Sequence, residues 1–107
     1  MRPRRAVSRW GGAIVTAYLK VVLAHSKTRG SVRVLMAAVA FYHDQYSGWP
    51  KRHHLPAMVN ETRRQCDKLI DYAVLDGELL VTSSGEYETG DFDEIKLNLH
   101  GHLGGVL

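Results

Sequence analysis

The sequence contains a single cysteine, Cys66, among 107 residues. One cysteine excludes an internal disulfide and is typical of a protein from a reducing compartment. The phosphate loop G-x-x-x-x-G-K-S/T, the nucleophile elbow G-x-S-x-G and the zinc motif H-E-x-x-H are all absent. Cys66 falls among apolar helical positions, where a small buried side chain is expected rather than a nucleophile. The histidines have no spacing that fixes a metal geometry. We therefore expect no enzyme, no cofactor and no metal site.

Long uninterrupted apolar runs are also absent. The apolar stretch at residues 13–24 follows a basic N-terminus, but Thr16, Tyr18 and Lys20 interrupt it, and it is too short to span a bilayer. No small-residue cleavage signature follows it. We expect a packed helix over residues 13–25, a cytoplasmic protein and no membrane partner.

Acidic side chains are nearly absent from residues 1–60, which contain ten Lys or Arg and one acid, Asp44, for a charge of +9. Residues 61–107 contain four Lys or Arg and ten acids, for a charge of −6. This division predicts an electrostatic partner for each half, or contact between the two halves. Residues 1–12 form a basic arm, in which Arg4 and Arg5 are candidates for contact with DNA phosphates or a minor groove. A solvated tail is the alternative interpretation.

The chain is long enough for one domain with a single core. We expect that domain over residues 13–99 and a flexible, Gly-rich tail over residues 100–107. The helix at residues 31–46, with Ser31 as its N-cap, is apolar on nearly every side, so it is predicted to lie at the centre of the core and to be covered on more than one side. The helix at residues 13–25 would complete this core or form a homodimer interface.

Residues 51–76 predict two helices joined by a tight turn. The first covers residues 55–59, where Pro56 suits the first turn, and the second covers residues 61–75 with Asn60 as its N-cap. Small or apolar side chains recur at helical spacing and mark the buried face of the second helix: Cys66, Leu69, Ile70, Ala73 and Val74. Its other face carries polar and basic side chains that can reach phosphates and base edges.

Two β-prone runs follow, at residues 79–82 and 95–99, joined by a Gly-rich polar segment. The order helix, turn, helix and hairpin resembles the winged helix-turn-helix family over residues 31–99. The resemblance is carried by Leu55, Val59, the pair Leu69 and Ile70, and the segment LDGEL at residues 75–79. It implies a mainly α fold with a small β-hairpin, here with an extra N-terminal helix.

This resemblance implies a small protein that binds double-stranded DNA, either a transcriptional regulator or an accessory factor of replication or mobile elements. Helix 61–75 would enter the major groove. The side chains that would read bases are Arg63, Arg64, Gln65 and Lys68. Asn60 and Thr62 would touch phosphates, and Lys51 and Arg52 would flank the helix. The interpretation requires outward-facing arginines. A structure that places Arg63 and Arg64 beneath other parts of the molecule, or beside the hairpin carboxylates as closed ion pairs, would contradict it.

The hairpin connection does not fit DNA binding as well as the helices do. Residues 84–94 contain five acids and no Lys or Arg: Glu86, Glu88, Asp91, Asp93 and Glu94. DNA phosphates would repel this wing, so we expect it to point away from DNA or to contact another protein. The alternative function is therefore a protein-interaction module or inhibitor that uses the acidic wing and binds no DNA.

Overall fold

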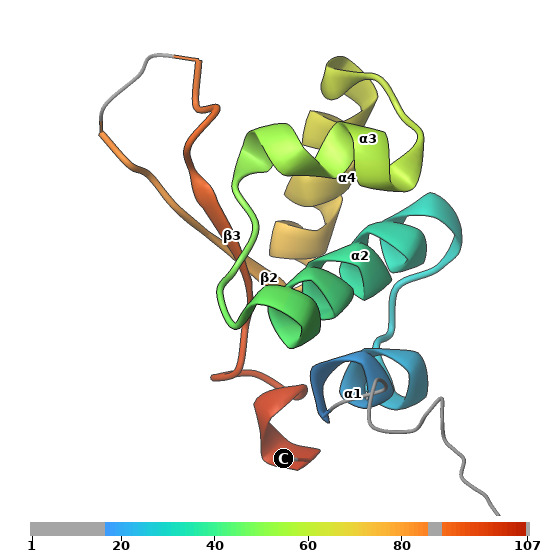
Figure 1. The fold of residues 1–107 in the computed structure, drawn as a ribbon. Helices are drawn as coiled ribbons and strands as arrows, with labels where there is room; N and C mark the ends of the chain where they lie inside the picture. The colour runs from blue at the N-terminus through green and yellow to red at the C-terminus, as the bar shows by residue number, and fades with distance from the viewer. Residues whose placement is uncertain (1–16, 86–88, 107) are drawn as a thin grey trace, which may run out of the picture.

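The computed structural model describes residues 17–85 and 89–106. Within these ranges the chain is mainly helical with a two-stranded antiparallel sheet, which confirms the predicted helices plus hairpin (Figure 1). The α-helices and strands, in order, are α1 Ala17–His25, α2 Gly30–Tyr46, α3 Leu55–Val59, α4 Arg63–Leu75, β2 Leu79–Thr82 and β3 Glu94–Leu97. Two short 3-10 helices, η2 and η3, cover Arg52–His54 and Gly104–Val106. None of the helices in the described ranges is long and apolar enough to cross a membrane.

Helix α2 lies at the centre of the core, as its sequence predicts. Leu35, Met36 and Val39 are fully buried, and the helix packs against α1, α3, α4 and β3. One face stays open: Val34 is 54% exposed and Phe41 is 41% exposed. The expected Ser31 cap is wrong, because the helix already begins at Gly30 and no side chain caps it.

Helix α1 packs on α2 as the extra N-terminal helix (Figure 1). Its Val21 and Val22 are buried. The first four residues of the expected helix, 13–16, and the basic arm at residues 1–12 lie outside the described residues.

Helix α4 and its N-cap begin two residues later than predicted. Helix α3 covers the predicted Leu55–Val59, but Asn60 adopts a left-handed φ of 56° and ends α3 instead of capping α4. Thr62 is the N-cap of α4, and its hydroxyl oxygen accepts a hydrogen bond from the Gln65 amide at 3.1 Å. A Thr hydroxyl supplies the acceptor that the first helical turn needs, so the helix begins at Arg63 and not at Glu61.

Helix α4 buries the face that its periodicity predicts, with one exception. Cys66, Leu69, Ile70 and Ala73 are buried, whereas Val74 is 39% exposed. Val74 lies one position past Ala73, and the rotation of the helix turns it away from the core.

The sheet pairs β2 with β3, with Leu79 opposite Leu97 and Val81 opposite Ile95. Strand β2 has its predicted bounds, whereas β3 covers Glu94–Leu97 instead of residues 95–99. On the other edge of β3, the Ile95 amide donates to the Pro50 carbonyl at 2.9 Å, and Lys51 and Glu94 form a single β-bridge. The linker after α2 therefore contacts the sheet at one bridge.

The C-terminal segment is part of the fold, which corrects the expected flexible tail at residues 100–107. Leu103 is fully buried in the core. At Gly104 an added Cβ would lie 1.7 Å from the Leu99 carbonyl oxygen, so only glycine fits there. The domain therefore extends beyond residue 99.

Candidate nucleic-acid interface

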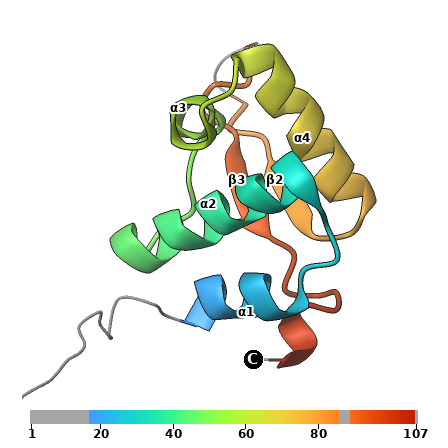
Figure 2. The same cartoon turned by 90° about the vertical axis from the view of Figure 1, so that its right-hand side faces the viewer.

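Four of the predicted DNA-contacting residues lie on the first two turns of α4. Helix α4 begins beside α3, at the end of the molecule opposite α1 (Figures 1 and 2). Arg64 and Lys68 are exposed and stand four residues apart, so they share one face of the helix. Thr62 is exposed at the N-cap, and Gln65 is half-buried beside it. These side chains form a polar surface around an outward-facing pair of cations.

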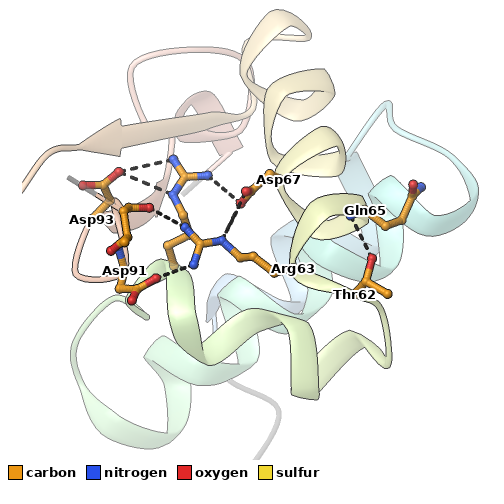
Figure 3. A network of polar contacts seen from close by, with 8 residues as sticks. Thr62, Arg63, Gln65, Asp67, Asp91 and Asp93 are labelled. Atoms are coloured by element: carbon orange, nitrogen blue, oxygen red, sulfur yellow. Dashed lines mark hydrogen bonds and ion pairs between the residues drawn. The ribbon is translucent and has the colours of Figure 1, made fainter. Parts of the chain in front are cut away.

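Arg63 does not belong to this free surface. Its Nε donates to Asp67 at 3.0 Å, its Nη2 donates to the Thr89 carbonyl at 2.6 Å, and its Nη1 donates to the Asp91 carboxylate (Figure 3). Asp67 lies one helical turn away, whereas Thr89 and Asp91 belong to the hairpin. The predicted outward orientation therefore holds for Arg64, while Arg63 is closed in an ion-pair network.

Arg52 joins the same network from the segment before α3. Its Nη1 is 3.1 Å from Asp67, and its Nη2 is 3.4 Å from Asp93. Two backbone hydrogen bonds run alongside, from the Arg52 amide to the Asp93 carbonyl at 2.8 Å and from the His53 amide to the Asp91 carbonyl at 3.1 Å. The returning leg of the hairpin is thus fastened to the entrance of α3.

The charges of this network nearly cancel. Two arginines face three aspartates: Arg52, Arg63, Asp67, Asp91 and Asp93. The hydrogen bond from Arg63 holds the pKa of the Asp91 carboxyl below its ordinary value, and the same bond raises the pKa of the Arg63 guanidinium. Both groups are therefore charged at neutral pH, and they neutralise each other locally.

The remaining predicted contacts are dispersed. Lys51 places its Nζ 3.8 Å from Glu94, and its amide donates to Nδ1 of His54. Burial lowers the pKa of His54, and His53 and Lys51 add to this lowering, so His54 is neutral at neutral pH. Asn60 is exposed at the turn before α4. Arg4 and Arg5 lie outside the described residues.

The acidic wing is neutralised within the molecule as far as the structure describes it. Asp91 and Asp93 pair with arginines, and Glu94 pairs with Lys51 and Lys96. These three carboxylates are already paired within the molecule, so they are not free to bind a basic protein partner as the acidic wing was expected to do. Glu86 and Glu88 lie outside the described residues.

Sequence reasoning missed a buried carboxylate at the base of the hairpin. Glu78 is fully buried, and its carboxylate accepts hydrogen bonds from the Ser26 hydroxyl at 2.5 Å and the Lys27 amide at 2.6 Å. Nε2 of His102 lies 2.9 Å away. These contacts tie the α1–α2 loop and the C-terminal segment to the start of β2. No local pattern marks a buried acid, because glutamate is usually exposed.

An apolar groove opens between α1, α2 and α3. Its volume is about 420 Å³, and its lining is apolar: Leu19, Val34, Ala37, Ala38, Phe41 and Met58. Val34 and Phe41 on α2 and Met58 on α3 are exposed, which makes this face a candidate for contact with another protein.

The single cysteine, Cys66, is buried and free. Burial raises the pKa of the Cys66 thiol to about 11, so it is a poor nucleophile at neutral pH. Among residues 17–85 and 89–106, no group of three or more His, Cys, Asp or Glu side chains could hold a metal ion.

Comparison with protein-family models, curated proteins and solved structures finds no match for the chain.

Proposed function

We propose that this chain is a winged helix-turn-helix protein that binds double-stranded DNA. In this proposal α3 and α4 form the helix-turn-helix, the β2–β3 hairpin is the wing, and α4 enters the major groove. The observation that carries the proposal is the pair of exposed cations, Arg64 and Lys68, on one face of the outward end of α4. The cellular role would be that of a small transcriptional regulator or an accessory factor of replication or mobile elements.

The roles of individual side chains follow from their chemistry. Arg64 has the fork of donors that fits a guanine edge, and Gln65 has the amide that pairs with adenine. Lys68 would contact a base or a phosphate one turn further on. Thr62 and Asn60, at the start of α4, would approach the phosphate backbone. Arg63 contributes to DNA binding only when it leaves the hairpin carboxylate.

The test is DNA binding by charge-removing variants. We expect the wild-type chain to bind a fluorescein-labelled duplex of mixed sequence at low salt, measured by fluorescence anisotropy. Arg64→Ala should weaken this binding by about tenfold, because it removes a contact to a phosphate or base edge. It should also reduce the slope of log affinity against log salt by about 1.

Lys20→Ala is the matched control, because Lys20 is an exposed cation on α1, at the opposite end of the molecule. It removes the same charge and should change affinity much less. Equal effects of the two substitutions would mean that α4 is not the interface. No salt-dependent binding by the folded wild-type chain, nor by a folded variant in which Arg63 is freed from the hairpin carboxylate, would contradict DNA binding altogether.

A homodimer is the second part of the proposal, because one recognition helix reads only a short site. The groove lined by α1, α2 and α3 is the surface we assign to the second copy. The support for this assignment is that the face is apolar and that its Val34 and Phe41 side chains are exposed to solvent. Sedimentation velocity of the wild-type chain measures whether this dimer forms.

A further inference from the structure

We propose that the hairpin carboxylate of Asp91 occupies a DNA-phosphate site on Arg63, so that the wing holds one of the protein's own DNA contacts closed. The inference rests on the proposed DNA binding and extends it to regulation of the same site. The ligand is a phosphodiester of duplex DNA, and the competitor is a segment of the same chain. Asp91 would leave Arg63 when a phosphate takes its place.

The first support is the way in which the donors of Arg63 are divided. Its Nε bonds to Asp67, within α4, whereas its two terminal nitrogens bond to the hairpin, at Asp91 and at the Thr89 carbonyl. The terminal nitrogens form the edge of the guanidinium that grips two oxygens of a phosphate. The hairpin supplies two oxygens at that edge (Figure 3). Its oxygens therefore take the place that a phosphate would need.

The second support is the position of Arg63. It is the first residue of α4, directly after the N-cap Thr62 and directly before the exposed Arg64. The positive end of the helix dipole favours a phosphate near the start of α4, where Arg63 lies. Asp67 would keep the Arg63 side chain aligned during the exchange, because its bond to Nε does not involve the hairpin.

The third support is the difference between two ion pairs of the network. Arg52 and Asp93 are each 14% exposed, and backbone hydrogen bonds flank their contact. Arg63 is 35% exposed and Asp91 is 40% exposed. An exposed ion pair is weak and is screened by salt, whereas a partly buried pair is screened less. The outer pair can therefore open while the inner pair keeps the wing attached.

The turn that presents Asp91 is itself fixed. Gly90 has a φ of 74°, and an added Cβ would lie 2.9 Å from Oδ2 of Asp93. The Asp93 amide donates back to the Gly90 carbonyl at 3.0 Å. The backbone from Gly90 to Asp93 is thus held at Asp93, and release of Arg63 moves the Asp91 side chain and breaks the contact with the Thr89 carbonyl.

The experiment compares Asp91→Asn with Asp71→Asn on the same labelled duplex. Asp71 is an exposed acid on α4, so its substitution removes the same charge without freeing Arg63. We expect Asp91→Asn to bind about three- to tenfold more tightly than Asp71→Asn. Its salt slope should be steeper by about 0.9, the contribution of one added phosphate contact.

A double-mutant cycle with Arg63→Ala makes the test specific. Arg63→Ala should weaken binding only slightly in the wild-type chain, because the hairpin already occupies Arg63. In the Asp91→Asn background it should abolish the gain. Thermal unfolding of each variant checks that the fold is retained.

The outcomes separate the two proposals. A gain from Asp91→Asn that equals the gain from Asp71→Asn, or that survives removal of Arg63, would overturn the masked site while leaving Arg64-dependent binding intact. Absence of binding by both the wild-type chain and Asp91→Asn would overturn the DNA-binding proposal, and the masked site with it. Binding by Asp91→Asn but not by the wild-type chain would support a complete block.

Discussion

The two ends of the hairpin are both held by carboxylates, but in opposite environments. At the base, Glu78 is fully buried and is bound by the Ser26 hydroxyl, the Lys27 amide and His102. At the loop end, Asp91 is 40% exposed and binds a single arginine side chain. Water can replace the partner of Asp91, whereas nothing in the core can replace the donors to Glu78. Burial therefore makes one contact structural and leaves the other open to exchange.

The two ends of the hairpin also join different segments of the chain, one set important for stability and the other for the proposed function. The base joins the α1–α2 loop and the C-terminal segment, whose Leu103 is buried in the core, to the start of β2. The segments joined at the loop end are the start of α4 and the hairpin, which the proposal assigns to DNA. A competing phosphate could therefore act on the outer contact without unfolding the protein.

The largest expected effect tests the buried end. Glu78→Ala should lower the free energy of unfolding by about 3 kcal/mol, because it leaves the Ser26 and Lys27 donors without their acceptor and opens a cavity. Urea denaturation followed by circular dichroism measures the change. Asp91→Ala, which truncates the exposed carboxylate, is the matched control and should cost far less. Similar losses from the two substitutions would remove the distinction between the ends.

A smaller effect isolates one donor at the buried end. Ser26→Ala should lower the free energy of unfolding by about 1 to 2 kcal/mol, because Glu78 loses one hydrogen bond while keeping the Lys27 amide and His102, and Thr28 loses its contacts with the Ser26 hydroxyl. Ser83→Ala is the comparison, since Ser83 is exposed on the hairpin, where its hydroxyl accepts from the Gly85 amide. The Ser83 substitution should change stability little. A neutral result for Ser26→Ala would show that the other two donors alone satisfy Glu78.

The elements with local patterns could be predicted from the sequence. Proline placement before a turn gives α3 its bounds, and a β-prone run after Gly77 gives β2 its bounds. The start of α4 could not be fixed in this way, because Asn60 and Thr62 both belong to the residue types that cap helices. The backbone decided between them: Asn60 adopts the left-handed conformation that ends α3.

The ion-pair network could be predicted only in outline. The charge division between residues 1–60 and 61–107 indicated contact between the halves, and Arg52 does meet Asp67 and Asp93. The partner of Arg63 was not predictable, because Asp91 lies 28 residues away and the fold alone brings the two together. The candidate site therefore keeps Arg64 and Lys68 from the sequence and gains its wing contacts from the structure.

The smallest expected effect is the dependence on acidic pH of the stabilisation at the exposed, Asp91 end of the hairpin. Arg63 lowers the pKa of the Asp91 carboxyl in the folded protein, so the ionised form is favoured there more than in the unfolded chain. The resulting stabilisation is fully present above the ordinary carboxyl pKa of about 3.9 and is lost as pH falls through the lowered folded value. The stability difference between the wild-type chain and Asp91→Asn should therefore shrink below about pH 4.

The same difference should become much smaller in an Arg63→Ala background, because Asp91 then loses the largest cause of its lowered pKa and keeps only the Thr89 hydrogen bond and the nearby His53. Urea denaturation at a series of acidic pH values measures both expectations. A difference that keeps its full size without Arg63 would mean that the turn around Asp91, with its Thr89 hydrogen bond, stabilises the charged carboxylate. Because the turn would then hold Asp91 in place, the carboxylate could not leave Arg63 for a phosphate, and the exposed end of the hairpin would be as fixed as the buried one.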